Sequence, residues 1–265
     1  MSEKSRIYAI HSDRECERLE VQAEIAGIAD HLRHLEVRPG DVVLDIGCGS
    51  GSMSRTIARA FPQARVTGID IRPEYLAFAR ACSADGLLPN LEFRLADIFA
   101  LPYADASVDV VWTKYVLQWL RDPEAALAEI GRVLKPGGRL VSADFADFAV
   151  EHHPAAPDFE RDARRIMPNL VDVDIGRKVA PLLLKLGFAE VETTIETDKL
   201  YTVVGAIDPR RRWNWEMQWR AARPRLVELA GGEAEADHFI DRFMAHHDDP
   251  ATCTFTPLFI TKGRR

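Results

Sequence analysis

The first half of the chain alternates short apolar runs with segments whose apolar residues recur every three or four positions. The runs predict strands at 43–46, 64–70, 91–97, 108–112 and 139–144. The periodic segments predict helices at 15–35, 52–60, 123–134 and from residue 73 onward. Strands that alternate with helices predict a parallel sheet covered by helices on both faces.

The second half of the chain is less regular. We expect a loop with a short helix over 145–170, a helix over 173–186, a strand over 189–199, a largely helical and charged stretch over 205–248, and a last strand over 253–262. The predicted fold is therefore α/β, a doubly wound, mostly parallel, seven-stranded Rossmann-like sheet with an N-terminal helix and a helical insertion before the last strand. We divide it into an N-terminal segment (1–36), a core (37–204 and 250–265) and an insertion (205–249).

Composition narrows the class of protein. The chain is 47% apolar and 28% charged, which is typical of a soluble globular protein, and its net charge of −7 argues against a nucleic-acid partner. No stretch reaches the ~20 apolar residues that span a bilayer, and no apolar run of a signal peptide follows residues 1–6, so we expect a cytoplasmic protein without a membrane partner. The four cysteines show no Cys-x-x-Cys spacing, which predicts neither a zinc site nor a disulfide framework.

The run Val-Leu-Asp-Ile-Gly-Cys-Gly-Ser-Gly over 43–51 joins the first strand to the first core helix. Gly47, Gly49 and Gly51 lie at alternate positions, and a flat cofactor can lie against them because glycine has no Cβ. The dinucleotide fingerprint would require a third glycine at Ser52. The carboxylate of Asp45 would repel a phosphate and suits a ligand with an amine. The run favours a cofactor other than a dinucleotide; a tight turn without a ligand is the alternative.

Acids end four of the predicted strands. They are Asp45, Asp70, Asp97 and Asp144. Right-handed crossovers bring the carboxyl ends of parallel strands to one edge of a sheet, where open α/β sheets bind their ligands. A single acid there is often a helix N-cap, but four together predict a polar ligand. Asp70 can accept hydrogen bonds from both hydroxyls of a ribose.

These motifs together resemble those of a known enzyme family. The pattern Asp-x-Gly-x-Gly-x-Gly at 45–51, the strand end at Asp70, the segment Leu95-Ala96-Asp97-Ile98 and the turn Lys135-Pro136-Gly137-Gly138 follow one another as in class I S-adenosylmethionine (SAM)-dependent methyltransferases. The likeness covers roughly residues 40–145 and is strongest to the small-molecule branch, near the ubiquinone- and menaquinone-biosynthesis type. The asparagine-proline signature of adenine and glutamine N-methyltransferases is absent after the fourth strand.

The resemblance implies SAM as cofactor and a set of residues around it. In the core these are Asp45, Gly47, Cys48, Gly49, Gly51, Asp70, Ile71, Asp97, Ile98 and Lys114. Asp45 and the turn would face the aminoacyl part, Asp70 the ribose and Asp97 the adenine amino group. The resemblance also makes the N-terminal segment a lid that carries Tyr8, Arg18 and Gln22, with Arg18 and Lys114 as donors to the methionine carboxylate. A solvated helix face and a loop tyrosine are the alternative for these lid residues.

The acceptor site is less readable. The segment Arg-Arg-Arg-Trp-Asn-Trp-Glu-Met-Gln-Trp-Arg at 210–220 lies where this branch inserts helices over its acceptor. Basic residues among aromatics also suit stacking on nucleic acid, but acids follow closely, so we favour an aromatic lid over a small-molecule acceptor. The expected substrate-binding residues are Tyr115, Trp119, Trp213, Trp215 and Trp219. Packing of the tryptophans in a helical core is the alternative.

Methyl transfer from a sulfonium is an in-line displacement that needs mainly orientation of the reactants and exclusion of water. No general base is evident from the residues. The weak catalytic candidates are Asp144, Asp147, His152, His153 and Tyr115. For each histidine a solvent-exposed loop position is the alternative, and we expect no metal site.

The predicted function is thus methylation of a small molecule in natural-product or cofactor biosynthesis. Two rivals stay open, an enzyme of the cyclase kind that binds SAM without transferring its methyl group, and an NAD(P)-dependent oxidoreductase, against which Ser52 counts. The acceptor, the methylated atom and a homodimeric state are also left open by the residues.

Overall fold

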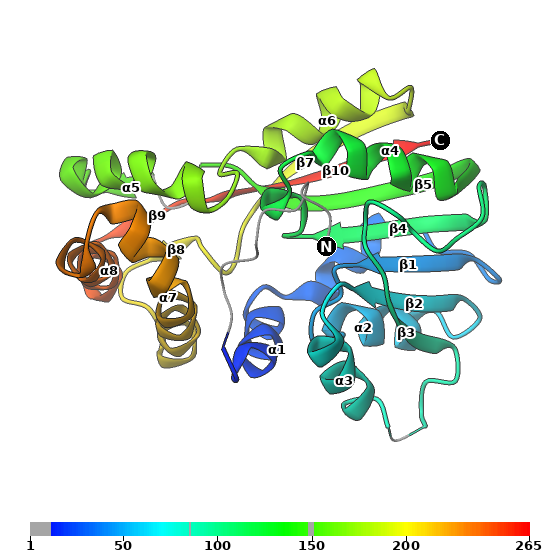
Figure 1. Ribbon diagram of the computed structural model, residues 1–265, viewed down its shortest axis with the longest axis horizontal. Helices are drawn as coiled ribbons and strands as arrows, with labels where there is room; N and C mark the ends of the chain where they lie inside the picture. Colours follow the sequence, from blue (N-terminus) through cyan, green and yellow to red (C-terminus); the bar gives the residue numbers. More distant parts are fainter. Residues whose placement is uncertain (1–11, 85, 148–150) are drawn as a thin grey trace.

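The computed structural model describes residues 12–84, 86–147 and 151–265. Its centre is a seven-stranded sheet in the order β3-β2-β1-β4-β5-β10-β7 (Figure 1). The strands are β1 (Val42–Ile46), β2 (Arg65–Asp70), β3 (Leu91–Leu95), β4 (Val108–Lys114), β5 (Leu134–Phe145), β7 (Ala189–Thr197) and β10 (Pro257–Arg264). β1 to β5 pair in parallel, and β10 is antiparallel to β5 and β7. This confirms the predicted fold class.

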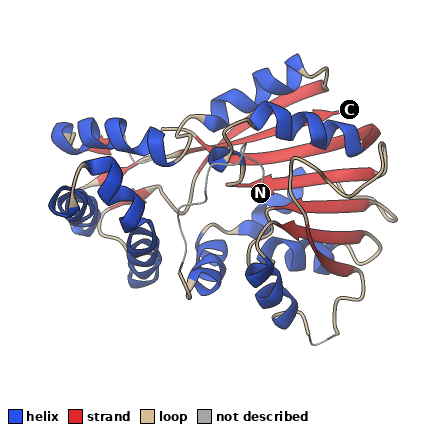
Figure 2. Cartoon of the chain, in the orientation of Figure 1, coloured by secondary structure: helices blue, strands red, loops and turns tan. Residues whose placement is uncertain are grey.

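Alternate residues of the central strands point to opposite faces of the sheet, and each face has its own core. Leu44 and Val111 pack with α4 (Pro123–Val133) and α6 (Ile175–Lys185). Val43 and Trp112 pack on the other face with α2 (Ser52–Ala60) and the 3-10 helix η1 (Ile28–His34). On the side of β2 and β3, α3 (Pro73–Ala81) completes the covering (Figure 2). The near-continuous apolar character of β1 and β4 follows from burial on both faces.

Three further helices and a small sheet form a second layer, here called the cap. The helices are α5 (Pro157–Leu170), α7 (Pro209–Ala230) and α8 (Glu233–Asp248), and the sheet joins β6 (His152–His153), β9 (Cys253–Thr254) and β8 (Val203–Val204). The helices share an apolar core that includes Phe159, Trp215 and Phe243. In Figure 1 they lie beyond one end of the central sheet.

The N-terminal segment differs from the prediction of one helix over 15–35. Helix α1 (Glu15–Ile25) ends before Gly27, whose φ of +60° is left-handed, and η1 follows. α1 packs against α7, and an ion pair between Glu24 and Arg210 joins them. The glycine therefore divides the segment into one part on the cap and one part on the core.

Two expectations for the second half of the chain were wrong. The loop with a short helix expected over 145–170 contains a 14-residue helix, α5, whose apolar residues recur at helical spacing. The single strand expected over 253–262 is divided, because β9 belongs to the cap sheet and β10 to the central sheet. In the described residues no helix has the length and apolar character that crossing a membrane requires.

Candidate functional site

The loop between β1 and α2 has a backbone that only glycine accommodates. Gly47 and Gly51 have φ values of +69° and +80°. A Cβ on Gly47 would overlap Cγ2 of Val116, and one on Gly51 would lie 2.7 Å from Cζ of Phe93. Helix α2 begins directly afterwards at Ser52, so the loop places a helix N-terminus at the carboxyl end of β1.

Two carboxylates form hydrogen bonds with this loop and with the first turn of α2. Oδ2 of Asp70, at the end of β2, accepts a hydrogen bond of 2.9 Å from the N–H of Gly49, and its Oδ1 accepts one of 3.0 Å from the N–H of Arg72. Oδ2 of Asp45 accepts a hydrogen bond of 2.5 Å from Oγ of Ser54. Burial raises the pKa of Asp70, and it raises the pKa of Asp45 to about 7 although the Ser54 hydrogen bond opposes this.

A cavity of about 440 Å³ opens on the loop and extends to the cap, a volume within the range of small-molecule sites. It brings together most of the residues predicted to bind the cofactor: Arg18, Gln22, Asp45, Gly47, Cys48, Gly49, Asp70, Ile71, Asp97, Ile98 and Lys114. Gly51 does not line the cavity; it shapes the turn beneath it. Tyr8 lies outside the described residues.

This end of the cavity fits SAM on three observations. The glycine loop lines the cavity with Gly47, Cys48 and Gly49, so its backbone can lie close to a ligand. Asp70 reaches the cavity with its carboxylate oriented by two backbone donors. Asp97 also lines the cavity and is held by the N–H of Phe99 at 3.0 Å. Carboxylates can accept from ribose hydroxyls, an adenine amino group and an ammonium group, the donors that SAM offers.

The lid residue Arg18 is already engaged with protein groups. Its guanidinium pairs with Glu15 at 2.6 Å, donates to Gln22 at 2.6 Å and reaches Asn214 of α7 at 3.4 Å. Lys114 ends β4, with Nζ 2.9 Å from Nε2 of His31, and removal from water lowers its pKa to about 8. Both cations line the cavity.

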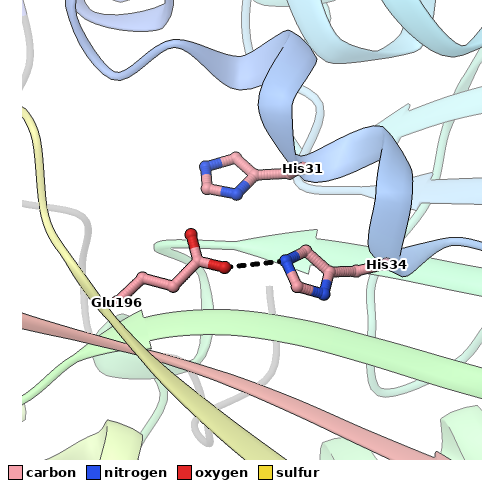
Figure 3. Close-up of side chains that lie close together, drawn as sticks. All are labelled: His31, His34 and Glu196. Atoms are coloured by element: carbon pink, nitrogen blue, oxygen red, sulfur yellow. Dashed lines mark hydrogen bonds and ion pairs between the residues drawn. The ribbon is translucent and has the colours of Figure 1, made fainter.

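Beside Lys114, two histidines of η1 face Glu196 on β7 (Figure 3). His31 and His34 are three residues apart, a spacing that eclipses side chains on a 3-10 helix. One ring nitrogen of each and a carboxylate oxygen of Glu196 lie within 4.8 Å of one another. Arg33 also pairs with Glu196 at 2.6 Å. Arg33 and Lys114 contact the cluster and bring positive charge to it. We therefore interpret the cluster as an ionic link between η1 and β7.

The cap end of the cavity is aromatic and apolar. Of the residues predicted for the acceptor, Tyr115, Trp119 and Trp219 line it. Trp215 instead packs in the cap core, and Trp213 lies outside the cavity beneath the guanidinium of Arg14, 5.1 Å from its ring centroid. Residues four apart on a helix share a face and residues two apart do not, which places 215 and 219 toward the cap interior and 213 away from it.

The catalytic candidates are not brought together. Asp144 is buried away from the cavity, where its Oδ2 accepts from Oγ of Ser142 at 2.6 Å and burial raises its pKa to about 7. His152 bonds Thr254 within the cap sheet at 2.9 Å, and the exposed His153 follows it.

Asp147, the remaining acid among the candidates, forms an ion pair with Arg177. Only Tyr115 lines the cavity, and its phenol donates a short hydrogen bond to the buried Asp198. No candidate other than Tyr115 can therefore reach a molecule in this cavity.

Several lining residues were not predicted. Among them are Gln118, Phe145, Met167, Leu170, Val171, Tyr201, Gln218 and Ala222. Met167 and Leu170 come from α5, whose 159, 163, 166, 167 and 170 spacing is a readable helical signal. Pro154 and Pro157 suggested a loop instead, although Pro157 stands in the first turn of α5, where proline is favourable to a helix.

The fold and the cavity define an α/β cofactor-binding domain with a capped ligand site. The chain matches the family described as "Methyltransferase domain" over residues 38–204, and it belongs to that family. The match confirms the resemblance to class I SAM-dependent methyltransferases and favours it over the oxidoreductase alternative.

Individual relatives agree with this membership. The chain is 39% identical to the "Uncharacterized 37.1 kDa protein in transposon TN4556" of Streptomyces fradiae over 67% of this chain and 51% of that one. It is 40% identical to the 27-O-demethylrifamycin SV methyltransferase of Amycolatopsis mediterranei over 50% of this chain and 47% of that one. The matched region thus spans about half the length of these two relatives.

Among solved structures, the Haemonchus contortus phosphoethanolamine N-methyltransferase 2 in complex with SAM is similar with a TM-score of 0.63 and 18% identity. The likeness covers 98% of this chain and 59% of that one. At this identity the likeness concerns the fold.

Proposed function

We propose that this protein is a SAM-dependent methyltransferase that acts on a small molecule in natural-product or cofactor biosynthesis. The single observation that carries the proposal is one continuous cavity lined by the glycine loop and Asp70 at one end and by Trp219 of the cap at the other. Such a cavity can hold a cofactor and an acceptor side by side. The rifamycin methyltransferase relative supports a small-molecule acceptor.

We assign the cofactor end to SAM, with Asp70 on the ribose, Asp97 near the adenine and Asp45 toward the ammonium group. When bound, SAM supplies a methyl group bonded to a sulfonium sulfur, and this sulfur leaves as a neutral thioether. Lys114 and Arg18 would hold the carboxylate of SAM through charge-assisted hydrogen bonds. The aromatic walls at Trp119 and Trp219 position the acceptor and exclude water, which supplies the orientation that in-line displacement requires.

Tyr115 is the residue through which a proton can leave an acceptor hydroxyl. Its phenol donates to Asp198, and Asp198 is fixed by the N–H groups of Leu200 and Tyr201 at 2.9 and 3.1 Å. The acceptor proton would pass to the phenol oxygen as the phenol proton passes to Asp198. Among the catalytic candidates, only Tyr115 lines the cavity, which supports this path.

The test is a panel of hydroxylated aromatic and polyketide-like acceptors incubated with methyl-labelled SAM and analysed by mass spectrometry. A product heavier by one CH₂ group, with the label, supports methyl transfer. If the acceptor is instead rearranged without a change of mass, and only when SAM is present, the cyclase-like alternative replaces the proposal. The Asp70→Ala protein is the control, since its weaker SAM binding should lower the yield of labelled product.

A further inference from the structure

The cap end of the cavity contains one amide group that no other described residue pairs with through its side chain. Gln118 belongs to the short helix η2 (Leu117–Trp119), it is 5% exposed, and it lines the cavity. Its Oε1 is buried and has no hydrogen-bond partner in residues 12–84, 86–147 and 151–265. An unpaired buried polar atom costs about 1–3 kcal/mol, so a ligand group that pairs with it recovers this loss.

The backbone of Gln118 is held in place while its side chain is free to bind. Its carbonyl oxygen accepts a hydrogen bond of 2.9 Å from the N–H of Asp172. The other amide at this end, Gln218, differs because its Oε1 already accepts from the hydroxyl of Tyr201 at 3.3 Å. Exchanging the oxygen and nitrogen of the Gln118 amide would still present an unmet hydrogen-bonding group to the cavity.

Charge is distributed unevenly along the cavity. Among the described lining residues, the charged side chains come from α1, the strand ends and the segment after β2: Arg18, Asp45, Asp70, Arg72, Glu74, Asp97 and Lys114. The cap and β5 add only neutral side chains, among them Phe145, Met167 and Trp219. Arg18 reaches Asn214 at 3.4 Å and Nζ of Lys114 lies 4.7 Å from the ring centroid of Tyr115, but both cations are assigned to the carboxylate of SAM. A charged acceptor would find no further counter-ion there and would lose its hydration, which is costly.

From this arrangement we infer that the acceptor is an uncharged, largely apolar molecule with a planar ring system and a hydroxyl group, and that Gln118 binds this hydroxyl. The aromatic walls take the ring faces, and the amide provides one fixed polar point that sets the orientation. The inference rests on the proposed function, since it assigns the acceptor of the same site.

The experiment uses the full chain loaded with S-adenosylhomocysteine (SAH), the demethylated product, and three probes: 2-naphthol, naphthalene and 2-naphthoate. Isothermal titration should show 2-naphthol binding about five- to tenfold more tightly than naphthalene, and 2-naphthoate binding most weakly. In Gln118→Leu the preference for 2-naphthol over naphthalene should disappear while naphthalene binds as before. Gln63→Leu, on an exposed turn outside the cavity, is the matched control and should keep the preference.

Three results would overturn the inference: 2-naphthoate binding as tightly as 2-naphthol, a preference that survives in Gln118→Leu, or no binding of any probe to the SAH-loaded protein. Unchanged SAH affinity and an unchanged melting temperature would show that Gln118→Leu folds. If it does not fold, Gln118→Glu replaces it, and this variant must bind 2-naphthol at least as well as the unaltered protein. Failure of SAH itself to bind contradicts the proposed function as well, and so separates the two claims.

Discussion

The backbone N–H of Gly49 donates a hydrogen bond of 2.9 Å to Oδ2 of Asp70. The contact ties the loop after β1 to the end of β2, where the two strands pair in parallel through Asp45 and Gly68. The carboxylate is therefore oriented before a ligand arrives, and the cofactor site does not need to be assembled on binding.

We expect Asp70→Ala to weaken SAM binding about 10- to 100-fold, since two charge-assisted hydrogen bonds to the ribose are each worth about 1.5–3 kcal/mol and water replaces them in part. Isothermal titration with SAM measures this. Asp158→Ala removes a carboxylate whose side chain is 76% exposed and should leave the dissociation constant unchanged. Equal affinity of both variants would remove Asp70 from the cofactor site.

Gly47→Ala should unfold the protein at lower denaturant than Gly187→Ala. Both glycines have left-handed φ, which costs an alanine about 1–2 kcal/mol, but only at position 47 does the new Cβ overlap another side chain, that of Val116. The double variant Gly47→Ala with Val116→Ala should recover part of the difference. Equal midpoints for the two single variants would show that the close approach to Val116 is unimportant.

SAM affinity should rise several-fold between pH 6 and pH 7.5. The ionised carboxylate of Asp45 attracts the ammonium group of SAM, and burial raises the pKa of Asp45 to about 7, so ionisation falls within this window. In Asp45→Asn the rise should be absent. Titrations at four pH values test this, and an unaltered protein whose affinity does not change across the window would contradict the role of Asp45.

Asp144→Asn should stabilise the protein at pH 8. Burial raises the folded-state pKa of Asp144 to about 7, above its ordinary value of 3.8, so the native state holds a proton that the unfolded state releases between those values. Stability from this group therefore falls as pH rises from about 4 to 7, and the asparagine avoids that loss. At pH 8 we expect the melting temperature to rise by about 2–4 °C for each kcal/mol gained in the free energy of unfolding. At pH 4 we expect no gain. A lower melting temperature at pH 8 would contradict the predicted cost of the buried charge.

The cofactor end of the site could be predicted from the sequence because the residues that form it lie close together along the chain. The glycine loop, the acids at strand ends and α2 follow from consecutive residues, and 11 of the residues predicted for the cofactor line the cavity. The cap was only partly readable. Helical spacing indicates which face of α7 is buried but not that α5 and Phe145 lie opposite it, because those contacts join segments far apart in the chain.

The roles proposed for Gln118 and Asp198 could not be predicted from the sequence either. Nothing near Gln118 in sequence marks it as a binding group, and its meaning comes from burial without a partner. Asp198 gains a role through the phenol of Tyr115, which is 83 residues away.

The most direct test of the central claim is isothermal titration of the full chain with SAM, SAH and NADH at pH 7.5. The cavity predicts binding of SAM and SAH at one site per chain with micromolar dissociation constants, and no heat from NADH at millimolar concentration. Binding of NADH without binding of SAM or SAH would contradict the assignment of the glycine loop, Asp45 and Asp70 to a methyl donor.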